Sequence, residues 1–85
     1  METIEVTVFT KDGCHLCDQM LAQLDAIRHD DIGNPRFSVN VRDIEDRQEW
    51  YELYREYVPV LVVNDEEVCH YFLDHQEFEQ ALSCP

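Results

Sequence analysis

The sequence predicts a single α/β domain in which a four-stranded mixed sheet is flanked by three helices. Three observations support this fold class: alternating apolar and polar residues at the start of the chain, apolar residues at helical spacing directly after them, and a continuous apolar run that begins at Val60. Strand and helix patterns follow one another in the order β-α-β-α-β-β-α. The chain of 85 residues has room for one domain, which we expect to span residues 1–85.

The first strand and the first helix follow each other closely. Ile4, Val6 and Val8 alternate with polar residues and lead into Phe9, which predicts a strand. After a loop at residues 10–13, apolar residues recur at helical spacing until Gly33-Asn34-Pro35 ends the pattern. The apolar residues of this predicted helix are Leu16, Met20, Leu21, Leu24 and Ile27.

The middle of the chain repeats this order with a second strand and a second helix. Phe37, Val39 and Val41 alternate with polar residues, so one face is less apolar than the other, and we expect an edge strand. Asp46, followed three residues later by Glu49, resembles a capping box that starts a helix. Four residues share one face of that helix, and we expect them to pack in the core: Trp50, Leu53, Tyr54 and Tyr57.

The last third of the chain predicts a hairpin and a closing helix. The segment Val60–Val63 is apolar throughout, as expected of a central strand that is covered on both faces. Asn64-Asp65 predicts a tight turn into a final strand over Val68–Phe72. Asp74, followed by Glu77, predicts the cap of a helix whose apolar residues are Phe78, Ala81 and Leu82.

Composition and charge exclude several functional classes. The formal net charge is −13 and the pI is about 4.3, so most of the surface repels a polyanion and we expect no nucleic-acid partner. We attribute this acidity to solubility, with attraction to basic protein partners as the alternative. The start of the chain lacks the pattern of a signal peptide, and no window approaches the length of a membrane span. We therefore expect a cytoplasmic monomer that has no membrane partner.

The motif Cys14-His15-Leu16-Cys17 lies where the first strand gives way to the first helix. Two cysteines three residues apart in the first turn of a helix bring their sulfurs within disulfide reach. The unpaired N–H groups and partial positive charge of a helix N-terminus stabilise a thiolate at Cys14. Cys17, one turn further into the helix, is better suited to remain a thiol until it attacks a mixed disulfide. We predict that Cys14 is the catalytic nucleophile and Cys17 the catalytic resolving residue.

Two alternatives remain for this cysteine pair. A zinc site would combine it with Cys69, His70 or Cys84, but these residues lack a second CxxC spacing, so we expect no metal. The other alternative is a redox-idle binding or adaptor module, in which both thiols have ordinary reactivity. Four structural cysteines are disfavoured because a CxxC at a strand–helix junction, in a chain without a signal sequence, is typical of redox chemistry.

The order of these features resembles that of the glutaredoxin and thioredoxin families over nearly the whole chain. The shared features are a strand, a CxxC at a helix start, a helical crossover, a strand opened by Val58-Pro59, a hairpin and a closing helix. The approach Lys11-Asp12-Gly13-Cys14 and the string CHLCD are most similar to those of small glutaredoxin-like proteins of bacteria. The resemblance implies a thioredoxin fold and a thiol-disulfide oxidoreductase that reduces or exchanges disulfides of a protein or a small thiol.

The resemblance also implies which residues surround the cysteine pair. Lys11, the only lysine in the chain, resembles the cation that precedes the family motif. Val58-Pro59 corresponds in position to the cis-proline that packs beside the CxxC in the family. The substrate-binding residues implied in this way are Lys11, His15, Leu16, Val58, Pro59 and Asp74.

The resemblance raises the question of whether this protein uses glutathione as a substrate. Glutaredoxins hold its γ-glutamyl end with a Gly-Gly turn and a following acidic residue, because small residues let backbone amides approach the ligand. This chain has no glycine after Gly33, and the corresponding stretch, Cys69–Asp74, is bulky. We therefore expect no required cofactor, weak or absent use of glutathione, and a protein dithiol as the natural partner.

Overall fold

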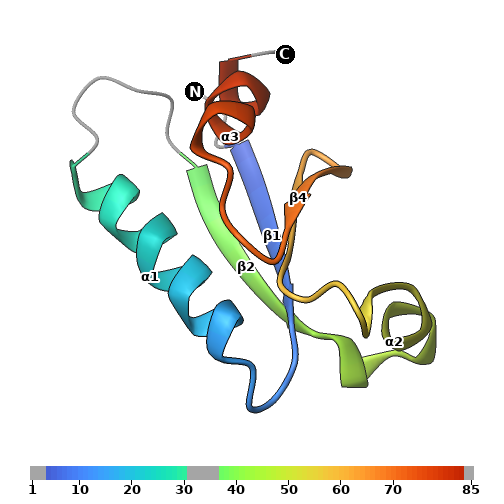
Figure 1. The fold of residues 1–85 in the computed structure, drawn as a ribbon. Helices are drawn as coiled ribbons and strands as arrows, with labels where there is room; N and C mark the ends of the chain where they lie inside the picture. The colour runs from blue at the N-terminus through green and yellow to red at the C-terminus, as the bar shows by residue number, and fades with distance from the viewer. Residues whose placement is uncertain (1–3, 31–36, 84–85) are drawn as a thin grey trace.

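The computed structural model describes residues 4–30 and 37–83 (Figure 1). The predicted order β-α-β-α-β-β-α is confirmed, with one additional 3₁₀ turn, η1, after the second strand. The region around Gly33-Asn34-Pro35, where we expected the first helix to end, lies outside the described residues. The elements are β1 (Ile4–Thr10), α1 (His15–Asp30), β2 (Phe37–Asp43), η1 (Ile44–Asp46), α2 (Gln48–Tyr54), β3 (Val60–Val63), β4 (Glu66–His70) and α3 (His75–Ser83).

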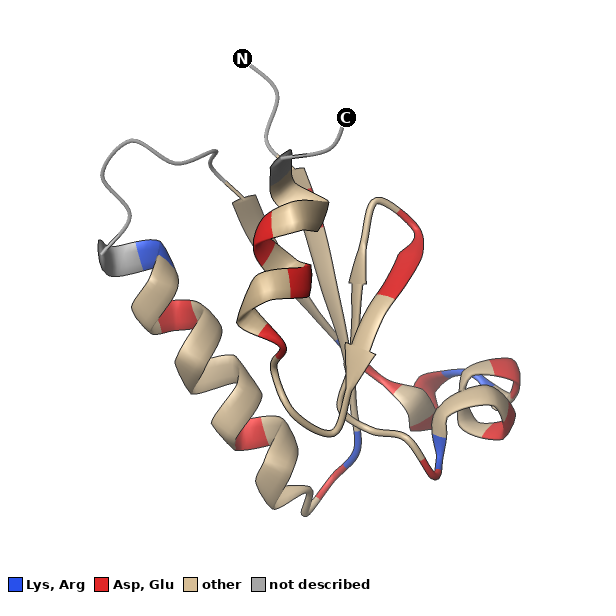
Figure 2. Cartoon of the chain, turned by 45° about the horizontal axis from the view of Figure 1, so that its top comes forward, with Lys and Arg blue, Asp and Glu red and all other residues tan. Residues whose placement is uncertain are grey.

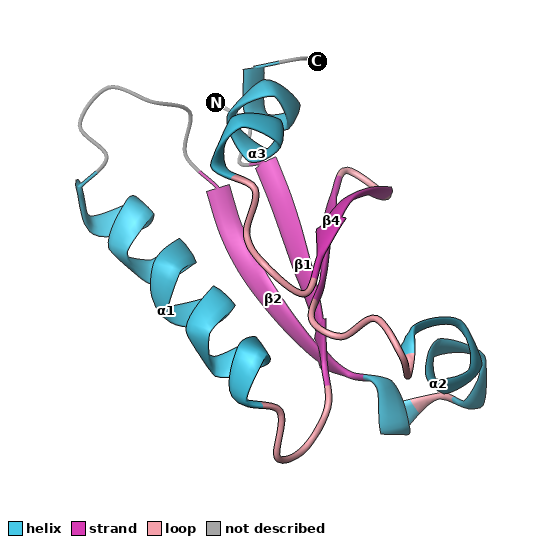
Figure 3. Ribbon diagram, in the orientation of Figure 1, coloured by secondary structure: helices cyan, strands magenta, loops and turns pink. Residues whose placement is uncertain are grey.

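The four strands form one mixed sheet in the order β2-β1-β3-β4 (Figure 3). β1 pairs with β2 in parallel, whereas the β1–β3 and β3–β4 pairs are antiparallel. The predicted edge position of β2 and central position of β3 are therefore confirmed. Because β1 and β2 are parallel and in register from Ile4↔Phe37 to Thr10↔Asp43, their carboxyl ends meet at one edge of the sheet.

Alternation along the strands divides the core between the two faces of the sheet. Val6 and Val8 of β1 face the larger cluster, which α1 and α3 cover, whereas Phe9 belongs to a smaller cluster on the side of α2. Figure 1 shows α1 and α2 on opposite sides of the sheet. The buried members of the larger cluster are Val6, Val8, Met20, Leu24, Phe37, Leu61, Val63, Leu73, Phe78 and Leu82.

The start of the second helix differs from its prediction. The capping role predicted for Asp46 is wrong, because Asp46 ends η1 and α2 starts at Gln48 without a side-chain cap. The capping carboxylate is instead that of Asp43, whose Oδ1 accepts a hydrogen bond from the Glu45 N–H at 2.8 Å and starts η1. An aspartate at the end of a strand competes for the same local backbone donors, which is why the turn begins earlier.

The predicted core face of α2 is only half correct. Trp50 and Tyr54 pack against Phe9, with ring centroids 5.2 and 4.6 Å from it. Leu53 is 61% exposed, and Tyr57 is 45% exposed and lies beyond the helix. A helix of seven residues turns only one pair of side chains at i and i+4 towards the sheet, so the other two predicted core residues remain outside.

The β3–β4 hairpin turns at Asn64-Asp65, as predicted. Both residues have positive φ, 50° and 67°, which is the conformation that a two-residue type I′ turn requires and that Asn and Asp tolerate without glycine. The predicted end of β4 at Phe72 is wrong, because the strand ends at His70. Tyr71 has a φ of 65°, which takes the chain out of the extended conformation, and Phe72 is 66% exposed.

The closing helix has the predicted cap. The Glu77 N–H donates to Asp74 Oδ1 at 3.1 Å, and the Phe78 N–H donates to the Asp74 carbonyl at 2.9 Å. Phe78 is fully buried and meets the Phe37 ring edge-on at 5.2 Å, which fixes α3 on the sheet. Within residues 4–30 and 37–83, no helix has both the length and the apolar character needed to cross a membrane.

Candidate active site

A tight turn connects β1 to α1 and positions the first cysteine. The Cys14 N–H donates to the Lys11 carbonyl at 3.2 Å, which closes the turn, and Gly13 occupies its third position with a φ of 75°. A Cβ at Gly13 would meet no atom within 4 Å, so glycine is favoured there by the backbone conformation and not by a lack of space. This turn places Cys14 directly before the first residue of α1.

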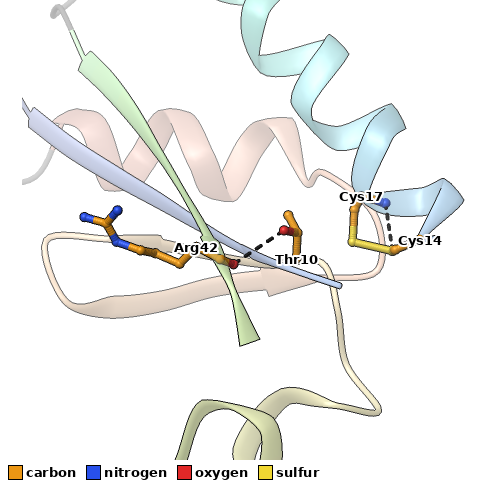
Figure 4. The surroundings of a disulfide bond; sticks show 4 residues. All are labelled: Thr10, Cys14, Cys17 and Arg42. Atoms are coloured by element: carbon orange, nitrogen blue, oxygen red, sulfur yellow. Dashed lines mark hydrogen bonds between the residues drawn. A yellow bond between two sulfur atoms is a disulfide. The ribbon is translucent and has the colours of Figure 1, made fainter. Parts of the chain in front are cut away.

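Cys14 caps the helix that follows it. Its carbonyl accepts from the Asp18 N–H at 3.3 Å, and its Sγ accepts from the Cys17 N–H at 3.1 Å (Figure 4). The sulfur thus occupies the place that the oxygen of Ser, Thr or Asp takes at an N-cap, where it receives a backbone donor. A negatively charged sulfur gains more from this donor and from the helix dipole than a neutral one does.

The two sulfurs of the motif form a disulfide between residues of different exposure. Cys14 and Cys17 are joined with a Cα–Cα distance of 5.2 Å, within the range that disulfides adopt (Figure 4). Cys17 is only 2% exposed and belongs to the buried core, whereas Cys14 is half-buried. An approaching thiol or disulfide therefore reaches Cys14 first.

A hollow of about 310 Å³ lies beside the disulfide. Asp43 reaches it from the end of β2, because the parallel register places Asp43 opposite Thr10 at the start of the β1–α1 turn. Thr10 Oγ1 in turn donates to the Arg42 carbonyl at 3.4 Å (Figure 4). The residues lining the hollow are Thr10, Lys11, Asp12, Gly13, Cys14, Cys17, Asp18, Leu21 and Asp43.

Sequence reasoning identified only part of this lining. Lys11 lies in it together with both cysteines, as the resemblance implied, but three carboxylates, those of Asp12, Asp18 and Asp43, surround the same space. The sequence signal for Asp43 was its place at the carboxyl end of a strand, which becomes informative only once parallel pairing with the first strand is known.

The other predicted site residues lie outside the lining of this hollow, among the described residues. The Val58-Pro59 peptide is cis, as the resemblance implied, and Pro59 is fully buried. The Pro59 carbonyl accepts from the Tyr71 N–H at 2.9 Å, which ties the proline loop to the turn after β4. Val58 is half-buried and packs against the cluster on the α2 side.

The remaining predicted residues are placed by the two helix starts. His15 is the exposed first residue of α1, and Leu16, which follows it, is half-buried. Asp74 is exposed, and one of its carboxylate oxygens caps α3. The structure therefore places Lys11 beside the cysteine pair. That a substrate contacts the other predicted residues remains a proposal; these are His15, Leu16, Val58, Pro59 and Asp74.

The further cysteines differ from the pair. Cys69 is half-buried on β4, and burial raises the pKa of its thiol. A backbone hydrogen bond at Asp74 lowers this pKa, whereas the negative charges of Asp74, Glu67 and Glu77 raise it. Cys84 lies outside the described residues. Among residues 4–30 and 37–83, no group of three or more His, Cys, Asp or Glu side chains is arranged to hold a metal ion.

Similar structures support the thioredoxin fold. The protein Ne2328 from Nitrosomonas europaea, solved in solution by NMR, has 33% sequence identity and a TM-score of 0.80, with 94% of this chain and 92% of that one covered. Thioredoxin 1 from the thermophilic eubacterium Thermosipho africanus has 16% identity and a TM-score of 0.56 over 93% and 90% of the two chains. A malarial protein has 13% identity and a TM-score of 0.65 over 96% of each chain.

The family assignment comes from the sequence match and from the first of these structures. None of the curated proteins matches this sequence. Residues 5–83 match the family described as Glutaredoxin-like domain (DUF836), which covers β1 through α3. This match, together with the thioredoxin fold and the cysteine pair at the start of α1, shows that the chain belongs to the glutaredoxin-like domain family.

Proposed function

We propose that this protein is a thiol-disulfide oxidoreductase in which Cys14 is the attacking thiolate and Cys17 the resolving thiol. The observation that carries the proposal is the asymmetry of the pair. Cys14 is accessible and its sulfur receives a backbone N–H at the helix N-terminus, whereas Cys17 is buried one turn further along. A helix N-terminus lowers the free energy of a thiolate relative to a thiol, so the accessible sulfur is also the activated one.

The proposed reaction transfers two electrons from the protein dithiol to a substrate disulfide. The Cys14 thiolate attacks one substrate sulfur, a mixed disulfide forms, and the other substrate sulfur leaves as a thiolate that takes up a proton. Cys17 then loses its proton and attacks Cys14, which breaks the mixed disulfide and releases the second substrate thiolate. The protein ends in the Cys14–Cys17 disulfide form, and an external thiol reductant restores the dithiol.

Substrate contacts are assigned on the family resemblance. Lys11 lines the hollow beside Cys14, where its ammonium group favours a thiolate or a substrate carboxylate. His15 and Leu16 lie between the two cysteines, and the backbone of Val58, before the cis Pro59, is proposed to pair with an extended substrate chain. Asp74 is the acidic residue that would contact the amino group of a small thiol substrate.

A protein dithiol is the proposed partner, in preference to glutathione. Over the stretch where glutaredoxins have a Gly-Gly turn, this chain places Tyr71 at a φ of 65°, a conformation that glycine adopts more readily. The Tyr71 N–H is bonded to the Pro59 carbonyl, so this backbone amide is not free to bind a ligand carboxylate. Both features support a substrate larger than glutathione.

Disulfide turnover tests the proposed function. With dithiothreitol as reductant and a cystine-containing peptide as substrate, we expect the protein to accelerate reduction and the Cys14→Ser variant to lose the acceleration, because it has no attacking sulfur. Cys69→Ser is the matched control and should keep the activity, since that thiol lies on β4 outside the pair. Equal rates for wild type and Cys14→Ser would contradict the proposal and favour a redox-idle binding module.

A further inference from the structure

Three aromatic side chains form an exposed cluster on the side of the proline loop and β4. The Tyr57 and His70 rings lie 5.5 Å apart, His70 and Tyr71 4.8 Å apart, and Tyr57 and Tyr71 6.4 Å apart, all measured between centroids. Tyr57 is 45% exposed and Tyr71 38% exposed. We call Tyr57, His70 and Tyr71 the aromatic cluster. Phe72, the next residue in the chain, is also exposed.

Hydrogen bonds hold one member of the aromatic cluster, Tyr71, in place. The Tyr71 N–H donates to the Pro59 carbonyl at 2.9 Å, and the Tyr71 hydroxyl donates to the Glu56 carbonyl at 2.5 Å. Tyr71 also has a positive φ, which is unfavourable for a bulky residue and points to a role for the side chain beyond folding. The Tyr71 ring is therefore arranged in advance, so a partner would lose little free energy in ordering it.

The charge around the aromatic cluster is mostly negative, with Arg55, two residues before Tyr57, as the basic exception. All six Lys and Arg residues lie before Glu56, and the remainder of the chain has seven Asp and Glu residues and neither Lys nor Arg. Figure 2 shows acidic residues and no basic ones along the β3–β4 hairpin and α3. Glu67 lies at the margin of the aromatic cluster, with its Oε1 3.9 Å from His70 Nδ1. A cation that approaches these rings is therefore attracted by the C-terminal third of the domain.

Aromatic faces beside a carboxylate, here that of Glu67, fit one kind of side chain best. The planar guanidinium of arginine stacks on aromatic rings and pairs with carboxylates, and it sheds water more readily than an ammonium group does. The chain makes such a contact internally, where the Arg47 guanidinium lies 5.1 Å from the centre of the Trp50 ring. A second copy of this chain does not fit, because its acidic surface would be repelled.

We propose that the aromatic cluster is a docking surface for an arginine-containing basic segment of a partner protein. The surface adjoins the proline loop through the Tyr71–Pro59 hydrogen bond. It does not depend on the chemistry of the cysteine pair. Binding at this surface and disulfide exchange at Cys14 are therefore separate properties that can fail independently.

The test uses the full chain and short peptides that contain no cysteine. In one peptide arginine alternates with glycine and serine, in the second lysine replaces arginine, and in the third glutamine does. We expect the arginine peptide to bind roughly threefold or more tightly than the lysine peptide, and the glutamine peptide not to bind. Amide NMR shifts should concentrate at residues 56–58 and 67–72.

Two exposed tyrosines provide a matched pair of variants. Tyr57→Leu removes a ring of the aromatic cluster and should weaken arginine-peptide binding by roughly threefold, whereas Tyr51→Leu removes an exposed ring on α2 and should not change it. Equal binding of the arginine and lysine peptides, no effect of Tyr57→Leu, shifts centred on another surface, or dimerisation of the chain would each overturn the proposal. Loss of turnover with unchanged peptide binding would contradict the redox function alone.

Discussion

Cys17→Ser is expected to hold a disulfide substrate on Cys14 as a stable mixed disulfide. The variant keeps the N-capping sulfur of Cys14 and loses the thiol that is placed to release it, because Cys17 is the residue whose sulfur pairs with Cys14. Incubation of the reduced variant with a cystine-containing peptide should convert most of the protein to an adduct. Non-reducing gel electrophoresis and mass spectrometry of the intact protein measure this fraction.

The matched variant is Cys14→Ser, which should form little adduct at position 17. Its remaining sulfur is 2% exposed in the wild-type structure and lies past the first turn of α1, where stabilisation of a thiolate by the helix end is largely lost. Cys69→Ser and Cys84→Ser in both backgrounds remove adducts that form at the other two cysteines. Equal trapping by Cys14→Ser and Cys17→Ser would show that the assigned roles of nucleophile and resolver are wrong.

Reduction of a glutathione mixed disulfide is expected to be on the order of 10- to 100-fold slower than reduction of an equivalent peptide disulfide. This range corresponds to the loss of one or two charge-assisted hydrogen bonds between backbone amides and the glutathione carboxylate. The bonds are lost because the Tyr71 N–H is already bonded to Pro59 and bulky side chains occupy the stretch from Cys69 to Asp74. A comparison of kcat/KM for the two substrates, with the same reductant, measures the difference.

Two substitutions of Tyr71 distinguish the effect of its side-chain bulk from the effect of its hydroxyl group. Tyr71→Gly should raise kcat/KM for the glutathione mixed disulfide in part, because glycine accepts a φ of 65° and removes a bulky side chain, while the amide of residue 71 stays bonded to Pro59. Tyr71→Phe removes only the hydroxyl that donates to Glu56 and should leave this kcat/KM unchanged. Equal kcat/KM values for glutathione and peptide disulfides in the wild type would contradict the proposed preference for protein partners.

The sheet could be predicted from sequence because its residues obey simple periodicities. Val6 and Val8 alternate with polar neighbours and face one cluster, and the uniformly apolar β3 lies in the middle of the sheet. The Asn64-Asp65 turn and the Asp74 cap followed because each depends on a few adjacent residues. Local chemistry of this kind is readable in a single sequence.

The errors arose where neighbouring signals competed or where the tertiary arrangement decided the outcome. Asp43 and Asp46 both offer a capping carboxylate, and only the geometry at the end of β2 selected Asp43. Tyr71 leaves the strand early with a φ of 65°, opposite Pro59, which has no N–H to continue the ladder beyond the Val60↔His70 pair. The acidic lining of the hollow beside Cys14 likewise depends on the parallel pairing of β1 with β2.

The rate of cysteine alkylation at pH 6 tests the activation of Cys14 most directly. The measurement uses reduced protein in a Cys84→Ser background, iodoacetamide, and peptide mass spectrometry to assign each label. At this pH a thiol with an ordinary pKa is almost wholly protonated, and burial has raised the pKa of Cys69 further. We predict that Cys14 is alkylated at least about tenfold faster than Cys17 and Cys69, because only its sulfur combines access with the helix N-terminal donor. Equally slow alkylation of all three cysteines would contradict the activated nucleophile.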